Sequence, residues 1–133
     1  MVFRGDYWFL SNMYPTELRD EDGRVYSCVE AMFQSRKCKN AEDKERFVGI
    51  NGFDAKRLGR RIALRDDWES VKVAEMEAIL MQKFSKPELK SMLKAIDGEI
   101  AEENTWHDTY WGVCNGYGQN NLGKLLMKIR NLA

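Results

Sequence analysis

An apolar stripe with helical spacing follows the acidic pair Asp66–Asp67. It consists of Val73, Met76, Leu80 and Phe84, which recur at intervals of three and four residues. Such side chains share one face of an α-helix, whereas a strand would send neighbouring side chains to alternate faces. Either aspartate can cap the start of this helix through its side-chain oxygen. The chain must therefore fold with at least one amphipathic helix packed against its core.

Helix signals outnumber strand signals along the rest of the chain. Strands are expected only where short alternating runs, Thr16–Arg19 and Arg24–Cys28, flank an Asp-Gly turn. The runs Tyr7–Pro15 and Glu102–Gln119 follow neither period and predict packed loops. Helices are expected at 29–39 with Ser27 as cap, at 41–48 with Gly52 as breaker, at 54–64, from Pro87 to Gly98 with Leu89, Met92 and Leu93 inward, and at 121–132 with Leu122, Leu125, Leu126 and Ile129 buried. The prediction is a single α+β domain, residues 1–133, predominantly helical with a small antiparallel β-hairpin.

The overall charge limits how the chain can meet nucleic acid. It has 21 basic and 21 acidic residues, whereas a protein that binds mainly by neutralising phosphates normally has a basic excess. Any nucleic acid is therefore expected to be engaged locally, at a strand end or at one modified nucleotide. Apolar residues make up 44% of the chain, enough for a core without metals or disulfides.

The cysteines and the single histidine argue against a metal site. Cys28, Cys38 and Cys114 are widely spaced, and His107 has no second histidine nearby. This pattern contains no zinc-ligand pair and no disulfide framework, so buried cysteines and no metal or cofactor are expected. The first residues lack a signal-peptide pattern, and no apolar run is long enough to span a membrane. The expected location is the cytoplasm, without membrane contact or an obligatory protein partner.

The first predicted helix contains the first candidate site. Glu30, Gln34 and Lys37 are spaced i, i+4 and i+7, so they share a face on which Glu30 and Lys37 lie roughly 10 Å apart. A ligand can lie between the carboxylate and the amine and be oriented by the amide. The alternative is an ordinary solvated helix face.

A second candidate is the run Glu102–Gly112, which combines Trp106, Trp111, His107 and several carboxylates. Aromatic rings suit stacking on a nucleobase, and a nearby aspartate can accept ribose hydroxyls or stabilise a developing positive charge. The alternative is that both tryptophans are core residues that hold the loop down.

Two weaker signals concern anions and a helix cap. The run Gly116–Asn121 predicts a turn before the last helix, with Asn120 or Asn121 as the cap. Four arginines could grip phosphates through paired donors or could simply be solvated; they are Arg57, Arg60, Arg61 and Arg65.

Five motifs in the same order make the chain similar to the NADAR family, also called YbiA-like, over nearly its whole length. The helix run Val29–Lys37 resembles the family's Val-Glu-His-Ala-Phe-Gln-Ala-Ala-Lys, with Ala31 where many members carry histidine. No essential role is therefore expected at that position. The other matching motifs are Phe9–Pro15 with Met13 in place of phenylalanine, Gly59–Arg60 followed by Arg65, Asp67, Trp68, Lys72, Met76, Lys83 and Phe84, then His107–Gly112, and Gly118–Arg130.

The resemblance implies a YbiA-like fold and N-glycosidase chemistry with three catalytic residues, Lys37, Glu30 and Asp108. In the implied mechanism Lys37, its pKa lowered by partial burial, attacks ribose C1 to form a Schiff base while Glu30 moves protons. Asp108 holds ribose hydroxyls or stabilises positive charge. The implied substrate contacts, with Arg65 preferred for phosphate and Trp111 as a stacking wall, are Ser11, Asn12, Gln34, Arg65, Trp111, Gly112 and Asn120.

The bond to be broken joins ribose C1 to an exocyclic amine, and the family acts on two such substrate classes. Removal of ADP-ribose from modified guanine bases in nucleic acid is the favoured function, with ADP-ribosylated single-stranded DNA or RNA as a candidate partner. The alternative is hydrolysis of phosphoribosylamino-pyrimidine intermediates of riboflavin synthesis. A mechanism in which Glu30 and Asp108 activate water directly, without a lysine adduct, stays open. So does a non-catalytic ADP-ribose-binding module, although intact Glu30 and Lys37 argue against it.

Overall fold

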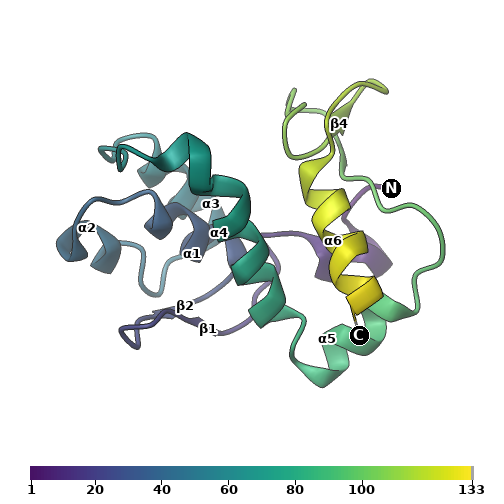
Figure 1. Ribbon diagram of the computed structural model, residues 1–133, viewed down its shortest axis with the longest axis horizontal. Helices are drawn as coiled ribbons and strands as arrows, with labels where there is room; N and C mark the ends of the chain where they lie inside the picture. Colours follow the sequence, from purple (N-terminus) through teal and green to yellow (C-terminus); the bar gives the residue numbers. More distant parts are fainter. Residues whose placement is uncertain (133) are drawn as a thin grey trace. The chain divides into compact units, whose positions relative to one another are not determined.

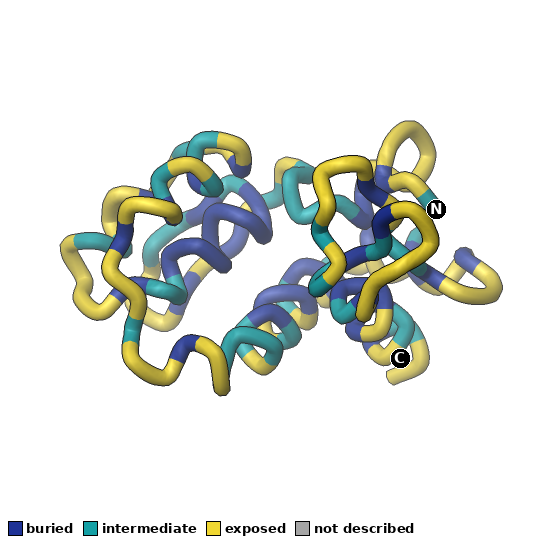
Figure 2. Tube along the Cα trace, turned by 90° about the horizontal axis from the view of Figure 1, so that it is seen from above, coloured by how far each residue is buried: buried dark blue, intermediate teal, exposed yellow. Residues whose placement is uncertain are grey.

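The computed structural model describes residues 1–132 and is predominantly helical (Figure 1). The chain divides into a middle unit, Asn12–Lys83, and an outer unit that joins Met1–Ser11 to the chain from Phe84 onward. Buried residues gather on the helices, and the connecting loops are more exposed (Figure 2). The predicted α+β class with a small antiparallel hairpin is confirmed. No helix in these 132 residues is long and apolar enough to cross a membrane.

The predicted hairpin forms in the middle unit. Strand β1 (Leu18–Arg19) pairs antiparallel with β2 (Val25–Tyr26). The turn between them is closed by Asp20, whose Oδ1 accepts the backbone N–H groups of Asp22 at 3.0 Å and Arg24 at 2.9 Å. Aspartate favours such turns because its short side chain can bond to the backbone two residues further on.

Four helices follow the hairpin: α1 (Val29–Arg36), α2 (Ala41–Glu45), α3 (Gly52–Gly59) and α4 (Trp68–Lys83). Asparagine side chains cap two of them, Asn40 at α2 and Asn51 at α3, and each accepts a first-turn backbone N–H at 2.9 Å. These bonds satisfy N–H groups that have no partner inside the helix. The local sequence therefore fixes where α2 and α3 begin.

Several helix boundaries differ from the predictions. The prediction that Ser27 caps α1 is wrong: its Oγ donates to the Ile50 carbonyl, and Cys28 occupies the cap position without a side-chain bond. The prediction that Gly52 lies outside the helices and breaks the one at 41–48 is wrong. Gly52 is the first residue of α3, because Asn51 caps the helix there. Both α1 and α3 end earlier than predicted, at residues 36 and 59.

The predicted apolar stripe lies on α4, and this helix packs against α1. Met76 and Leu80 are buried as predicted, while Val73 is only half-buried. At the start of α4 the Trp68 ring lies 5.1 Å from the Phe33 ring of α1, measured between centroids. Because α1 also packs against α3, it lies between two helices and its polar residues cannot all face solvent.

The outer unit contains a short 3-10 helix, η1 (Gly5–Leu10), then α5 (Pro87–Lys94), α6 (Asn121–Leu132) and a parallel pair formed by β3 (Glu103–Asn104) and β4 (Val113–Cys114). Two segments predicted as packed loops thus include short regular structure that neither sequence period reveals. The prediction for α6 is confirmed in its bounds and in its four buried aliphatic side chains. The helix α5 begins at the predicted proline but ends before Gly98.

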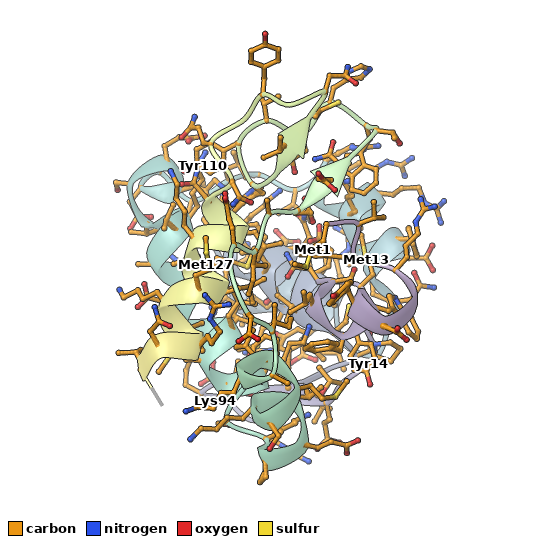
Figure 3. The ribbon with its side chains drawn as sticks, turned by 90° about the vertical axis from the view of Figure 1, so that its right-hand side faces the viewer. Met1, Met13, Tyr14, Lys94, Tyr110 and Met127 are labelled. Atoms are coloured by element: carbon orange, nitrogen blue, oxygen red, sulfur yellow. The ribbon has the colours of Figure 1, made fainter. Side chains whose placement is uncertain are left out.

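The chain start is held inside the outer unit (Figure 3). The Met1 ammonium donates to the Ala101 carbonyl at 2.9 Å and pairs with the Glu103 carboxylate at 3.0 Å. Further along, the Phe9 ring lies edge-on to the Phe84 ring, with 6.5 Å between centroids. Residues far apart in sequence therefore share one core.

Candidate active site

The polar face of α1 is buried. Glu30 is 9% exposed and Gln34 is 5% exposed, so the alternative of a solvated helix face is wrong. The Gln34 Nε2 donates to Glu30 Oε1 at 2.8 Å, and the Glu30 backbone N–H donates to the Asn12 carbonyl at 2.9 Å. Burying a carboxylate is costly unless hydrogen bonds compensate. A carboxylate kept in such a place is therefore a candidate for chemistry.

Two glycines let α3 approach this face closely. A Cβ at Gly59 would overlap the side-chain oxygen of Gln34, and a Cβ at Gly52 would overlap the Met13 sulfur and lie 3.3 Å from Glu30 Cβ. Glycine is thus required at both ends of α3 by the close contact with α1. The small residues of α3 place a helix backbone directly over the Glu30–Gln34 pair.

Two side-chain oxygens beside Glu30 have no hydrogen-bond donor. Asn12 Oδ1 and Gln34 Oε1 are both buried and unsatisfied within residues 1–132. The other end of the Asn12 amide is engaged, since its Nδ2 lies 3.8 Å from the Met76 sulfur. A buried acceptor without a donor costs about 1–3 kcal/mol. Such atoms are rare in native proteins, and both lie in the buried polar cluster around Glu30.

Lys37 follows α1 and is held by its backbone. Its N–H donates to the Gln34 carbonyl at 3.2 Å, and its carbonyl accepts the Arg65 N–H at 2.8 Å. Within residues 1–132 its ammonium forms no ion pair, although the side chain is only half-exposed. Burial lowers the pKa of Lys37; the Glu30 charge acts in the opposite direction, and nearby Lys72 and Arg60 lower the pKa further. The amine is therefore closer to its neutral, nucleophilic form than an exposed lysine is.

Arg65 has less freedom than a phosphate ligand needs. Its guanidinium donates to Asp67 at 2.7 Å and to Glu75 at 2.9 Å. The hydrogen bond to Asp67 is the main cause that raises the pKa of Arg65, and the negative charge of Glu75 raises it further. The local charge around Arg65 is therefore largely neutralised, and its backbone bond to Lys37 gives it a positioning role.

In the outer unit, Asp108 organises the loop between β3 and β4. Its Oδ1 accepts the backbone N–H groups of Tyr110 at 3.1 Å and Trp111 at 2.9 Å. The Asn104 amide donates to the Asp108 carbonyl at 2.9 Å and accepts its N–H at 3.1 Å. Side chains rather than a regular ladder therefore set this loop. Gly112 is also required here, because a Cβ would overlap the Glu102 carbonyl oxygen.

The asparagines at the start of α6, Asn120 and Asn121, do not act as side-chain caps, contrary to prediction. The Asn120 amide donates to the Ile100 carbonyl at 2.9 Å and accepts the Glu102 N–H at 3.1 Å. The Asn121 amide donates to the Tyr110 carbonyl at 3.0 Å. Both side chains instead connect the start of α6 to neighbouring loops, which needs contacts that a local cap pattern cannot reveal.

The aromatic residues of this loop differ in exposure. Trp106 is 51% exposed, so the alternative that it is a core residue is wrong. Trp111 is half-buried, with its ring 5.0 Å from the Tyr110 ring at an interplanar angle of 83°. Ser11 closes η1, where its N–H donates to the Trp8 carbonyl at 2.9 Å.

Comparison with known proteins identifies the family of this chain. The family model described as the NADAR domain matches residues 2–132. The chain belongs to the NADAR family. This NADAR domain is 35% identical over 130 residues to the Escherichia coli protein named N-glycosidase YbiA, covering 94% of this chain and 81% of that protein. It is similar to the NMR structure of E. coli YbiA, with a TM-score of 0.86, 33% identity, and coverage of 99% of this chain and 81% of that one.

A plant relative has a different printed name. This NADAR domain is 36% identical over 113 residues to the Arabidopsis thaliana riboflavin biosynthesis protein PYRR, chloroplastic. That alignment includes 84% of this chain but only 18% of the plant protein. The similarity therefore concerns one part of a much longer chain.

The NADAR domain divides its predicted site residues between the two units. The middle unit brings together four of them along α1, namely Asn12, Glu30, Gln34 and Lys37, and it also contains Arg65. The outer unit contains Ser11, Asp108, Trp111, Gly112 and Asn120. In the outer unit, hydrogen bonds link Asp108 to Trp111 and Asn120 to Gly112, whereas only the α1 set was predicted from helical spacing.

Two residues beside the α1 set, Gly59 and Lys72, were not predicted as site residues, and Arg60 was predicted only as one of four arginines that could grip phosphates. Gly59 contacts the Gln34 amide, and Arg60 and Lys72 act on the charge of Lys37. The small residues Gly52, Ala55 and Gly59 recur at spacings of three and four, a signal of close helix packing that could have identified α3 as a neighbour. The predicted buried cysteines are confirmed, and burial raises the pKa of Cys38 to about 11.

Proposed function

We propose that this protein is an N-glycosidase that removes ADP-ribose from modified guanine bases in nucleic acid. The observation that carries the proposal is the buried Glu30–Gln34 pair one turn before a lysine amine whose pKa is lowered by burial. A carboxylate and an amine on one helix face can supply the proton transfer and the nucleophile for cleavage of an N-glycoside. The name N-glycosidase borne by the bacterial relative supports the same chemistry.

The proposed mechanism uses the Lys37 nitrogen as the nucleophile. In the ring-opened N-glycoside, C1 is an iminium carbon bonded to the exocyclic nitrogen of the base. The neutral amine adds to C1, a proton moves from the lysine nitrogen to the departing nitrogen, and the base leaves as a free amine. The protonated Schiff base between Lys37 and C1 then adds water and releases the sugar as an aldehyde, which restores the amine.

Glu30 is proposed as the group that moves protons between these nitrogens and water. Asn12 Oδ1 and Gln34 Oε1, the two buried acceptors, are proposed to take hydrogen bonds from ribose hydroxyls. From the family resemblance, Asp108 is proposed to hold hydroxyls or stabilise positive charge, and Trp111 to form a wall against the substrate. The two carboxylate bonds of Arg65 weaken the expectation that it binds phosphate.

The second candidate function is hydrolysis of phosphoribosylamino-pyrimidine intermediates of riboflavin synthesis. It is favoured by the printed name of the plant relative. The same bond type is broken in both substrates, so the α1 site serves either. A non-catalytic ADP-ribose-binding module is disfavoured because it gives no reason for burying Glu30 beside an unpaired amine.

A turnover assay on both substrates tests the proposal. Wild type, Lys37→Ala and Glu30→Gln are assayed with an oligonucleotide bearing ADP-ribosyl-guanine and with a phosphoribosylamino-pyrimidine, and Lys90→Ala on α5 serves as the control. We expect ADP-ribose release by wild type and the control, a loss of roughly a thousandfold or more in Lys37→Ala, and a loss of roughly a hundred- to ten-thousandfold in Glu30→Gln. Borohydride should trap a covalent adduct only where Lys37 is present.

Each other outcome points elsewhere. Turnover of the pyrimidine alone would move the protein to metabolite hydrolysis. Near-normal turnover in Lys37→Ala would overturn the covalent mechanism and leave direct activation of water. Binding of ADP-ribose without turnover of either substrate would make the protein a binding module.

A further inference from the structure

Positive charge is concentrated in one part of the neutral chain. Residues 36–65 contain ten Lys and Arg but only four Asp and Glu, whereas the whole chain has 21 of each sign. This segment includes α2, α3 and the turns around them. A local excess of this kind attracts a polyanion even when the net charge of the protein is zero.

Helix α3 presents two different faces. Its inner residues, Gly52, Ala55 and Gly59, are buried, and α3 packs against α1. Phe53 is 66% exposed and Arg57 is exposed one turn later, so these two side chains share the opposite face. The exposed face of α3 thus combines an aromatic ring with a guanidinium group.

Two arginines continue this face just past the helix. Arg60 and Arg61 are exposed, and neither forms an ion pair within residues 1–132. Arg57 differs from them, because it pairs with Asp54. The outer face of α3, defined as Phe53, Arg57, Arg60 and Arg61, therefore has an aromatic ring at one end and two unneutralised guanidinium groups at the other.

We propose that the outer face of α3 binds a single strand of nucleic acid and holds it beside the active site. Phe53 stacks on a base, and Arg60 and Arg61 contact backbone phosphates. This combination of a stacking ring with basic groups is how proteins hold single strands without reading their sequence. The inference rests on the proposed function and deepens it, because it names the surface that holds the nucleic acid and takes the nucleic acid to be a single strand.

The chemistry of the substrate favours a single strand. The exocyclic amine of guanine lies on its base-pairing edge, so a sugar attached there is incompatible with a normal duplex. A strand that is already unpaired also needs no energy to expose the modified base. The neutral net charge fits such a partner, since only a few phosphates need to be contacted.

The outer face of α3 adjoins the candidate active site where Gly59 meets Gln34. Gly59 contacts the Gln34 amide, and Arg60 is its neighbour in the chain, so the first free guanidinium begins next to the polar face of α1. The like charge of Arg60 lowers the pKa of Lys37, which agrees with this proximity. A phosphate at Arg60 would therefore place an adjoining modified base within reach of Lys37.

Binding of an unmodified, fluorescently labelled oligonucleotide tests the proposal without relying on turnover. Anisotropy is measured over a range of salt for wild type, Arg60→Glu/Arg61→Glu, the milder Arg60→Gln/Arg61→Gln, Phe53→Ala, and Lys90→Glu/Lys124→Glu as the matched control. The control makes the same charge change on exposed lysines of α5 and α6. Thermal melts confirm that each variant is folded.

We expect the Arg60→Glu/Arg61→Glu variant to bind at least about tenfold more weakly, with a smaller salt dependence by roughly 1.4 in log–log slope for two lost phosphate contacts. The glutamine variant should be intermediate, Phe53→Ala should weaken binding with an unchanged salt slope, and the control should bind like wild type. The proposal would be overturned if the control lost as much affinity for the oligonucleotide as the patch variants, which are those at Phe53, Arg60 and Arg61. It would also be overturned if wild type bound no oligonucleotide.

Turnover of a free ADP-ribosyl-guanosine separates this proposal from the proposed function. If Phe53→Ala, which leaves the charges around Lys37 unchanged, cleaves the free nucleoside normally but raises KM for the modified oligonucleotide, both proposals stand. If wild type cleaves neither substrate yet binds the oligonucleotide through the outer face of α3, the proposed function fails and the proposal that this face binds a single strand stands. If wild type cleaves both substrates and the patch variants do so equally well, the proposal that the outer face of α3 binds a single strand fails, and the proposed N-glycosidase function stands.

Discussion

At the scale of single residues, the strongest feature is the position of Lys37. Its amine is half-buried at the end of α1 and has like charges nearby, so its pKa lies below the ordinary value of 10.5. The folded protein therefore binds fewer protons there than the unfolded chain does between the lowered pKa and 10.5. Stability contributed by this group rises with pH across that window, and the penalty is fully present below it.

Replacement of Lys37 should consequently stabilise the protein while abolishing its chemistry. We expect Lys37→Met to raise the Tm at neutral pH by roughly 2 °C or more, with the difference shrinking as the pH approaches 10.5. Thermal melts at a series of pH values measure it, and Lys90→Met is the control because Lys90 is exposed. A Tm difference that is absent, or that grows with pH, would contradict the account of the buried amine.

The contact between Gly59 and Gln34 gives a second test at this scale. Gly59→Ala should lower stability and move the Gln34 amide, since the new methyl group overlaps its oxygen; we expect a loss of about 1–3 kcal/mol. In a Gln34→Ala background the same change should cost much less, because the obstructing amide is gone. Urea unfolding of the four proteins gives the coupling energy, and equal costs in both backgrounds would exclude the contact as the cause.

At the scale of elements, the loop after β3 depends on Asp108 for its shape. One oxygen accepts two backbone N–H groups, a task that an asparagine carbonyl can perform and an alanine cannot. We expect Asp108→Asn to stay within about 0.5 kcal/mol of wild type and Asp108→Ala to lose about 1–2 kcal/mol. If the charge also acts in catalysis, Asp108→Asn loses turnover while keeping stability. Full turnover in Asp108→Asn would restrict the residue to its structural role.

The helices and the hairpin could be predicted because their signals are local. The Asp-Gly turn located the strands, and the apolar periods of α4 and α6 identified those helices. The start of α1 at Val29 was predicted, but its cap was not, because Ser27 bonds to Ile50, a residue more than twenty positions away. The same applies to Asn120, whose partners Ile100 and Glu102 come from another loop. Capping rules consider only residues that are near in sequence, so they do not predict side chains that bond to distant residues.

The candidate site could likewise be predicted only where its signal is local in sequence. Spacing placed Glu30, Gln34 and Lys37 on one face, which the structure confirms for the first two as a direct hydrogen bond. Spacing could not show that this face is buried, since that depends on the approach of α3 through Gly52 and Gly59. The roles of Lys37, Glu30 and Asp108 in catalysis came from the family resemblance and stay predictions.

At the scale of the whole molecule, the cysteines report on how the two units unfold. Cys28 and Cys38 are buried in the middle unit and Cys114 in the outer unit, and burial raises the pKa of the first two thiols. If residues 1–133 form one cooperative domain, as predicted, all three thiols should become reactive at one urea midpoint. Alkylation followed by mass spectrometry at each urea concentration measures this, and two separate midpoints would show two independently stable units.

The two donorless oxygens on Asn12 and Gln34 also bear on which sugars the enzyme can tolerate. In the proposed function both atoms accept hydrogen bonds from neighbouring hydroxyl groups of a ribose, and a deoxyribose, which lacks one of these groups, would leave an oxygen unsatisfied. At about 1–3 kcal/mol for such a loss, the site would prefer ribose by roughly ten- to a hundredfold. An enzyme of this kind could move along a DNA strand and ignore the strand's own glycosidic bonds, cutting only where a foreign ribose has been attached.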